Sequence, residues 1–309
     1  MISIVIPAYN EEVNISIIYN QIKKVMGGLK KDYEIIFVDD GSRDNTFRNI
    51  ENLHKKDKIV KCIRFRRNFG QTAAMDAGIR NSNGDIIITM DADLQNDPND
   101  IPSLLRKLDE GYDLVNGWRY KRKDTFLSKR LPSLISNWLV RKLTKLRIHD
   151  QGCTLRAIRK NAVKDLRLYG EMHRFIPALV AMNGFKVTEV KVSHHPRRFG
   201  KTKYSFNRII KGLLDLLYIK FWSTYSTRPL HFFGSLGFIQ YIFAGLIFIE
   251  QIIKAFIIGR LNLGPLFLVG ILLVLNGTLF IMFGFLGEIL IRAYYKSEDI
   301  NQQIEKVLK

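Results

Sequence analysis

Residues 85–95 have the sequence Asp-Ile-Ile-Ile-Thr-Met-Asp-Ala-Asp-Leu-Gln, in which a short apolar run ends in two aspartates. A run of this length that is rich in isoleucine is typical of a buried β-strand. Because side chains alternate along an extended chain, Asp91 and Asp93 are expected to point the same way where the strand ends. The stretch therefore predicts a strand that brings a pair of carboxylates to the edge of a sheet.

Four further strands are expected around this one, with helical stretches between them. The strands are expected at residues 2–7, 33–38, 59–65 and 112–117, and the helices at residues 13–26, 46–54, 71–80 and 102–110. Such alternation indicates an α/β fold with a mainly parallel sheet, in which ligands bind beyond the carboxyl ends of the strands. Polar turns follow the first three strands at residues 7–11, 39–42 and 67–70. We expect these turns to line one nucleotide pocket together with the aspartate pair.

The paired carboxylates suggest a metal. Converging carboxylate oxygens suit a hard divalent cation that bridges to a diphosphate, and Gln95 could add a neutral oxygen. Mg²⁺ and Mn²⁺ both satisfy this chemistry, and the sequence does not separate them. The two cysteines, Cys62 and Cys153, have no metal-type spacing.

The chain is strongly basic, with a formal net charge of +19 over 309 residues. Such a balance favours polyanionic partners: nucleic acid, anionic lipid or phosphorylated substrates. Basic residues gather in residues 120–147, among apolar residues at near-helical spacing, and again in residues 191–211. The first stretch is either a solvated helix face or a surface that meets anionic headgroups and a phosphate.

The composition changes near the C-terminus. Residues 229–249 and 261–287 contain no Asp, Glu, Lys or Arg. Each run is long enough for a hydrocarbon core, which needs about 20 apolar residues. They predict a hairpin of two transmembrane helices, at about residues 230–251 and 264–288, with a pair of buried soluble helices as the alternative. A nucleic-acid partner would explain neither the hairpin nor the acidic strand ends, so none is expected.

The organisation and topology follow from these patterns. We expect a catalytic domain at residues 1–204, an amphipathic juxtamembrane segment at residues 205–228, the membrane hairpin within residues 229–291 and a tail at residues 292–309. Basic residues flank the hairpin on both sides, and the first residues lack the features of a signal peptide. The catalytic domain and the C-terminus are therefore expected on the cytosolic side of the cell membrane.

Seven short motifs together resemble glycosyltransferase family 2, in particular its branch of polyprenyl-phosphate glycosyltransferases, which includes dolichol-phosphate mannose synthases and bactoprenol glucosyltransferases. They are residues 5–11, 38–42, 67–70, 91–95, 150–153, 171–175 and 194–204, which occur in the family's order and cover nearly the whole predicted soluble domain. The resemblance implies a GT-A fold, followed here by amphipathic helices and the two-helix hairpin.

The resemblance also implies roles for individual residues. The nucleotide-binding residues would be Pro7, Tyr9, Glu11, Asp39, Asp40, Phe69, Gly70, Asp91 and Ala92. The metal ligands would be Asp91, Asp93 and Gln95, with Asp93 as the principal one. The catalytic residues would be Asp93, Asp150 and Arg119. The acceptor phosphate would be bound by Arg119, Arg130, Arg197, Arg198, Lys201 and Lys203, although Lys129 could align in place of Arg130.

The reaction that the resemblance implies is inverting transfer of a hexose from a nucleotide diphosphate to undecaprenyl or dolichyl phosphate. UDP-glucose is the leading donor and GDP-mannose the alternative. Because a phosphate oxygen is already anionic, the reaction needs little deprotonation, so we expect Asp150 to orient the acceptor or basic residues, with a base role as the second choice. Relatives suggest a homo-oligomer, with a tetramer among the options.

Two other functions are consistent with parts of this pattern. A processive polysaccharide synthase would use the same donor site, but the sequence has only two predicted membrane helices and no Arg-Trp pair of the kind that such enzymes use to hold a growing chain. A non-catalytic membrane scaffold that binds nucleotide sugar or lipid would retain the fold, but the intact pair of Asp91 and Asp93 argues against lost catalysis.

Overall fold

The computed structural model describes residues 1–120, 148–168, 170–196, 221, 225, 228–260 and 263–297, and the chain divides into two compact units, Met1–Tyr218 and Ile219–Lys309. Five residues predicted to meet the acceptor phosphate lie outside the described residues, as does most of the predicted juxtamembrane segment. These five are Arg130, Arg197, Arg198, Lys201 and Lys203. Their roles stay predictions.

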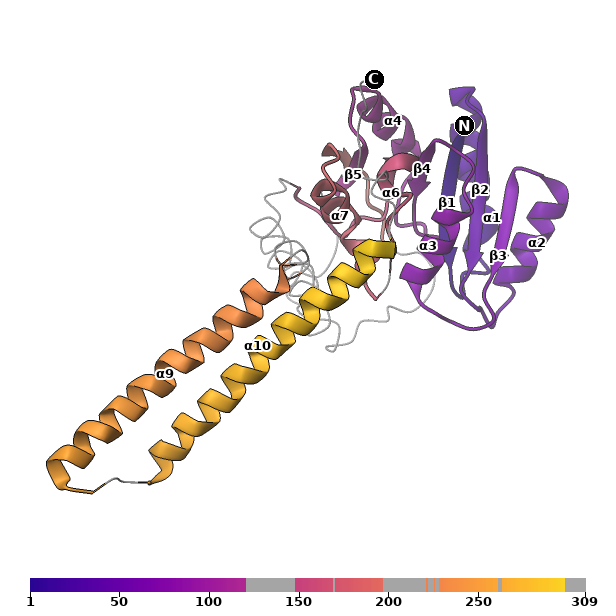
Figure 1. Ribbon diagram of the computed structural model, residues 1–309. Coiled ribbons are helices and arrows are strands. Elements are labelled where there is room, and N and C mark those ends of the chain that lie inside the picture. The colour runs from indigo at the N-terminus through magenta and orange to yellow at the C-terminus, as the bar shows by residue number, and fades with distance from the viewer. Residues whose placement is uncertain are drawn as a thin grey trace. The chain divides into compact units, whose positions relative to one another are not determined.

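The first unit contains a seven-stranded sheet in the order β3-β2-β1-β4-β6-β5-β7 (Figure 1). The strands are β1 (Ile2–Ala8), β2 (Tyr33–Asp39), β3 (Val60–Arg64), β4 (Ile86–Thr89), β5 (Leu114–Arg119), β6 (Arg156–Arg159) and β7 (Val187–Val192). All neighbouring strands pair in parallel except β6, which runs antiparallel to β4 and β5. The predicted mainly parallel sheet is confirmed, and it contains two strands, β6 and β7, that the sequence patterns did not predict.

Helices cover both faces of this sheet. The helices that the structure describes in the first unit are α1 (Asn14–Leu29), α2 (Thr46–Lys56), α3 (Gln71–Arg80), η1 (Pro98–Asp100), α4 (Ile101–Asp109), α6 (Lys160–Val163), η3 (Met172–Arg174) and α7 (Ile176–Met182). One core lies between the sheet and α1, α2 and α4, and the other lies between the sheet and α3, α6, η3 and α7. Strands that are buried on both faces explain why β1 has no polar-apolar alternation, since all seven of its residues are buried.

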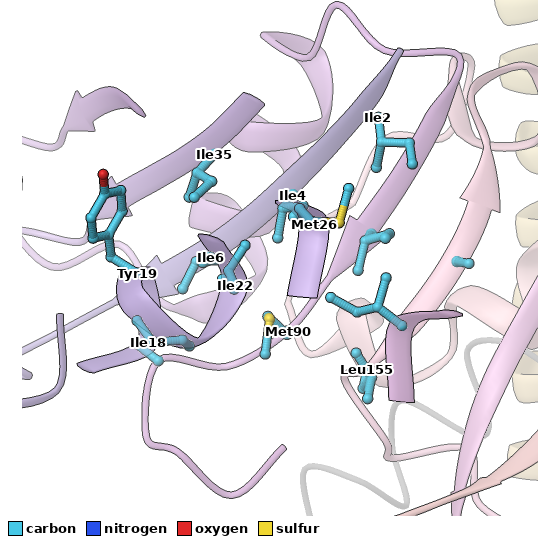
Figure 2. Packing of buried hydrophobic residues seen from close by; sticks show 14 of the residues in the cluster. Ile2, Ile4, Ile6, Ile18, Tyr19, Ile22, Met26, Ile35, Met90 and Leu155 are labelled. Atoms are coloured by element: carbon cyan, nitrogen blue, oxygen red, sulfur yellow. The ribbon is translucent and has the colours of Figure 1, made fainter. Parts of the chain in front are cut away.

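Isoleucine is the commonest residue in the first core. Ile4 and Ile6 of β1 point into it, where Ile18 and Ile22 of α1 pack against them (Figure 2). All four are fully buried, and each such side chain stabilises the fold by about 1.5–3 kcal/mol. This packing fixes α1 against β1, and so it holds the turn between them, which carries predicted site residues, at the carboxyl end of β1.

The second unit contains two long helices, α9 (Pro229–Ile258) and α10 (Pro265–Ser297), which run side by side (Figure 1). A Cβ atom on Gly237 would lie 2.6 Å from the carbonyl oxygen of Gly277, so the two backbones approach closely at these glycines. Tyr241 Oη and Thr278 Oγ1 form a hydrogen bond of 2.8 Å between the helices. Most of the remaining surface is apolar and exposed, with Phe256 at 86%.

Both helices are long and apolar enough to cross a membrane. The candidate spans are Pro229–Ile258 and Pro265–Ile291, with mean hydropathies of 1.9 and 2.5. Only 11% of each apolar window is buried within the protein. A core helix of a soluble protein would instead be largely buried, so the exposed apolar surface favours lipid as its surroundings.

Candidate active site

The carboxyl ends of β1 and β2 lie side by side, because Ala8 pairs with Asp39 in the parallel register. Two hydrogen bonds connect the turns that follow. The Asn10 amide donates to Ser42 Oγ at 2.9 Å, and the Arg43 amide donates to Asn10 Oδ1 at 2.9 Å. Asn10 has a positive φ of 56°, a conformation that asparagine tolerates better than most residues. Pro7, Tyr9 and Glu11, predicted nucleotide-binding residues, are thus held against the turn that begins with Asp39.

Asp39 is fully buried at this position. The Ser42 amide donates to its Oδ1 at 3.1 Å, and the Arg64 guanidinium lies 3.5 Å from its Oδ2. Oδ2 accepts no hydrogen bond from the residues that the structure describes. A buried carboxylate oxygen without a donor is a suitable acceptor for a ligand hydroxyl, such as one on a ribose.

Asp40, unlike Asp39, is hydrogen-bonded through its carboxylate to the loop after β3. Its carboxylate accepts hydrogen bonds from the Asn68 side chain at 2.9 Å and from the amides of Phe69 and Gly70 at 2.7 and 3.0 Å. Burial raises the pKa of Asp40 above its ordinary value, while these amides oppose the shift. The structure therefore uses Asp40 to hold the loop after β3, where Gly70 has a φ of 98° and the Phe69 ring is exposed.

Asp91 and Asp93 follow β4, and burial alternates through residues 91–98, so that odd positions face outward and even positions are buried. Ala92 accordingly lies in the core, while both aspartates are half-buried. Gln71 Nε2 donates to Asp91 Oδ1 at 2.6 Å, and the Gln95 amide donates to Asp93 Oδ1 at 3.2 Å. Burial thus alternates past the end of β4, although the backbone is no longer extended there, since Leu94 has a φ of 60°.

The two aspartates strongly influence each other. Burial and then the charge of Asp93 raise the pKa of Asp91 to about 7, although a hydrogen bond from Thr154 and the charges of Arg119 and Arg156 oppose the rise. A carboxylate whose charge is opposed by burial and by a neighbouring carboxylate is well suited to a divalent cation, which supplies the missing positive charge. The described residues contain no group of three or more His, Cys, Asp or Glu side chains that could bind a metal. A metal here would therefore depend on this pair, on the Gln95 oxygen and on ligand oxygens.

Arg119 and Asp150, both predicted catalytic residues, contact each other directly. Arg119 donates from Nε to Asp150 Oδ2 at 2.7 Å and from Nη2 to Oδ1 at 2.9 Å, and its backbone amide also points to Oδ2 at 3.3 Å. Burial alone would lower the pKa of Arg119, but the Asp150 carboxylate outweighs burial and raises that pKa above its ordinary value. The pair lies at the carboxyl end of β5, on the same sheet edge as the end of β4.

The segment after β7 also reaches this edge. Asn96 forms a β-bridge with His194, the His195 amide donates to the Gln95 carbonyl at 2.9 Å, and the Ser193 amide donates to Asp100 Oδ2 at 2.7 Å. These contacts hold residues 193–195 beside the aspartate motif, residues 91–95. The predicted phosphate-binding residues Arg197, Arg198, Lys201 and Lys203 follow shortly after them, outside the described residues.

A buried polar layer lies beneath these groups, and the sequence patterns did not predict its members as site residues. Arg156 is fully buried and donates to Asn116 Oδ1, to the His173 carbonyl and to the Gln151 carbonyl at 2.9, 2.8 and 3.1 Å. Neither polar atom of the buried Gln151 amide has a hydrogen-bond partner among the described residues. The one available signal is an arginine inside the apolar run Leu155-Arg156-Ala157-Ile158, where a charge is unusual.

His173 is neutral in this layer, because burial first and then the charges of Arg174 and Arg156 lower its pKa to about 3. Thr72 Oγ1 lies 2.6 Å from the Gly170 carbonyl, to which it donates, and 2.6 Å from His173 Nδ1. Because the hydroxyl has a single proton, His173 Nδ1 must be the donor in the second contact. This arrangement gives His173 a packing role and ties η3 to the first turn of α3.

These observations define an α/β protein in which carboxylates and arginines meet where the strands end, the edge at which such folds bind ligands. Residues 3–167 match the model of the family described as glycosyl transferase family 2, so the chain belongs to that family. Its predicted membership and its GT-A-like fold are confirmed by this match and by similar solved structures.

Similar curated proteins cover nearly the whole chain. The dodecaprenyl-phosphate galacturonate synthase of Rhizobium johnstonii is 39% identical over 302 residues, which is 96% of this chain and 89% of that protein. The undecaprenyl-phosphate 4-deoxy-4-formamido-L-arabinose transferase of Shewanella sediminis is 37% identical over 300 residues, which is 95% of this chain and 88% of that protein.

A similar solved structure is glucosyl-3-phosphoglycerate synthase from Mycobacterium tuberculosis in complex with Mn²⁺ and uridine-diphosphate-glucose. It has a TM-score of 0.55 at 19% sequence identity, and the match covers 71% of this chain and 78% of that chain. At this identity the likeness establishes a shared fold.

Proposed function

We propose that this protein transfers a hexose from a nucleotide diphosphate, with UDP-glucose as the leading donor, to a polyprenyl phosphate. The observation that carries the proposal is the meeting of two pairs at one sheet edge: the carboxylates Asp91 and Asp93, and the ion pair of Arg119 with Asp150. The names of both curated relatives include a polyprenyl phosphate, and the two apolar helices would keep the protein at the membrane that contains such a lipid.

The donor would bind along the ends of β1, β2 and β4. Asp39 Oδ2 is available to accept a hydrogen bond from a ribose hydroxyl, and the exposed Phe69 ring offers an apolar surface beside it. Asp91 and Asp93, with Gln95, would hold a divalent cation, which supplies positive charge to the diphosphate. Mn²⁺ in the complex of the solved relative supports a metal of this kind.

The acceptor would bind beside Arg119. An oxygen of the lipid phosphate forms a bond to the anomeric carbon, while the bond from that carbon to the nucleotide diphosphate breaks, which inverts the anomeric centre. Arg119 would bind the incoming phosphate, and Asp150 would fix the guanidinium in place through its two hydrogen bonds. Because the acceptor oxygen is already anionic, the reaction needs little deprotonation, and a base role for Asp150 stays the second choice.

Orientation and assembly complete the proposal. Basic residues on both sides of the hairpin favour a cytosolic position for the catalytic unit and the C-terminus. The lipid product would then form on the cytosolic leaflet. Self-association through the helices, as a tetramer or another homo-oligomer, stays a prediction.

Sugar transfer by the full chain in detergent tests the proposal. The assay would supply undecaprenyl phosphate and radiolabelled UDP-glucose, UDP-galacturonate or GDP-mannose, with Mn²⁺, Mg²⁺ or a chelator. We expect a labelled lipid that depends on the metal, and a loss of about 100-fold or more in Asp93→Asn. The matched control is Asp85→Asn, because Asp85 lies just before the amino end of β4, away from the site, and its side chain is 89% exposed.

The outcomes separate the candidate functions. Label from GDP-mannose alone would replace UDP-glucose as the donor and leave the reaction class in place. Nucleotide binding without transfer from any donor would contradict the proposal and favour the membrane scaffold.

A further inference from the structure

Arg156 has an unusual environment for a charged side chain. It lies in the middle of the sheet and is fully buried. Its three hydrogen bonds all go to neutral acceptors: the side-chain oxygen of Asn116 and the carbonyls of His173 and Gln151. Among the described residues, no carboxylate accepts one of these hydrogen bonds, and Asp91 and Asp150 act on Arg156 through their charge alone. Burying a charge without a paired counter-charge costs several kcal/mol, so such a group is expected to serve a purpose beyond packing.

This guanidinium keeps its charge. Burial lowers the pKa of Arg156 to about 10, which is still well above neutral pH. Arg119 differs in this respect, because its charge is balanced by the bidentate contact with Asp150. Arg156 therefore has no carboxylate that binds it as Asp150 binds Arg119, and its charge acts at a distance, on Asp91 among others.

The charge of Arg156 lies close to the aspartate motif at the end of β4. Arg156 is directly opposite Thr89 in the antiparallel pairing of β4 and β6, and Asp91 follows two residues after Thr89. A second connection runs through α3, where Gln71 binds Asp91 at 2.6 Å while the next residue, Thr72, binds His173 at 2.6 Å. Arg156 in turn holds the carbonyl of His173.

We propose that Arg156 is a positioning residue that supplies, from inside the sheet, a permanent positive charge for the diphosphate of the bound nucleotide. The inference rests on the proposed function, and it assigns to Arg156 an effect that operates through the electrostatic field without direct contact. A fixed charge in a poorly polarisable interior acts over a longer distance than one in water, and it needs no rearrangement when the ligand binds. The hydrogen bonds to Gln151 and His173 keep that charge in one place.

Arg159 provides a matched control on the same strand. Like Arg156, it donates to neutral acceptors, in this case the backbone carbonyls of Tyr112 and Leu108 at 3.1 Å each. It lies opposite Ile86, at the amino end of β4 and so at the far end from the site. Arg159→Met therefore removes the same charge and the same kind of hydrogen bond without changing the field at the site.

The experiment measures binding of uridine, UMP and UDP by calorimetry, with the full chain in detergent and a chelator present. Negative charge rises along this series while the base and ribose stay the same. We expect Arg156→Met to weaken UDP binding by about tenfold, equivalent to about 1.4 kcal/mol, to weaken UMP binding less and to leave uridine unchanged. Arg159→Met is expected to match the wild type for all three ligands.

Other outcomes would overturn the inference. Equal losses for all three ligands in Arg156→Met, or the same pattern in both variants, would show a structural role only. Arg156→Lys keeps the charge, so this variant should retain the wild-type ratio of UDP affinity to uridine affinity. A lower ratio would also contradict the inference. This test remains if Arg156→Met does not fold. A wild-type chain that binds neither UDP nor GDP and transfers no sugar would overturn the proposed function together with this inference.

Discussion

The ion pair of Arg119 with Asp150 allows a test of the two roles left open for this aspartate. Both carboxylate oxygens of Asp150 accept hydrogen bonds from the guanidinium, at 2.7 and 2.9 Å. A carboxylate held in this way is a poor base, because a proton would have to displace a strong contact. We therefore predict that Asp150 orients Arg119. The perturbation is Asp150→Asn, with Arg119→Met and the double variant completing a cycle.

The size of the effect follows from the burial of the pair. The side chains of Arg119 and Asp150 are 15% and 4% exposed. Removing one partner of a buried pair leaves an uncompensated charge and costs about 3–5 kcal/mol. In a domain of this size, that loss corresponds to a fall in Tm of roughly 6–20 °C. The double variant contains neither charge, so it should be less destabilised than the sum of the single variants by about 2 kcal/mol.

Thermal unfolding of the full chain in detergent measures the cycle, and the transfer assay measures its consequence for activity. If Asp150 orients Arg119, both single variants should raise the KM for the lipid phosphate, and the loss should not depend on pH. Additive losses of stability would refute the energetic argument. A wild-type KM in Asp150→Asn, combined with a lower kcat that recovers at higher pH, would show that Asp150 is the base.

Two further predictions concern the acid sensitivity of the fold and the helix hairpin. Burial alone would raise the pKa of Glu34, but the Lys61 ammonium at 2.6 Å helps to lower that pKa below its ordinary value. The folded state therefore has the lower pKa, so ionised Glu34 stabilises the fold above the ordinary carboxyl range. That stabilisation is lost as the pH falls below about 4. Glu34→Gln should therefore reduce the difference in unfolding free energy between pH 7 and pH 3.5, and an unchanged difference would assign the acid sensitivity to other groups. In the hairpin, a Cβ atom on Gly237 would meet the Gly277 carbonyl at 2.6 Å, whereas one on Gly245 would have no neighbour within 4 Å. Gly237→Leu should accelerate amide hydrogen exchange in both helices and Gly245→Leu should not, and equal exchange in the two variants would contradict close packing at Gly237.

Much of the fold was predictable because it depends on local patterns. The isoleucine runs of β1 and β4 are strands whichever elements lie beside them, and the apolar runs of α9 and α10 are long enough to identify without a structure. β6 and β7 were missed for the opposite reason. β6 has an arginine at each end, and β7 alternates like an exposed edge strand, so neither has the continuous apolar run that marked the other strands.

The chemistry of individual candidate residues was also accessible from the sequence. Asp91 and Asp93 stand where alternation places two carboxylates, and the half-buried state of both agrees with that argument. For Asp40 the residue type suggests a ligand contact, which stays a prediction, and only the structure shows that its hydrogen bonds hold the loop that contains Phe69 and Gly70.

By itself, the sequence determined the first five strands and the four helices between them, the apolar hairpin and the carboxylate pair, because each depends on residues that are near neighbours in the chain. Only the tertiary structure decided that β6 enters the sheet antiparallel, between β4 and β5. That single insertion brings Asp150 to Arg119 across 31 residues of sequence, and it buries Arg156 opposite Thr89. Which charges meet, and which one is left without a partner, depends on strand neighbours, and no local pattern specifies those.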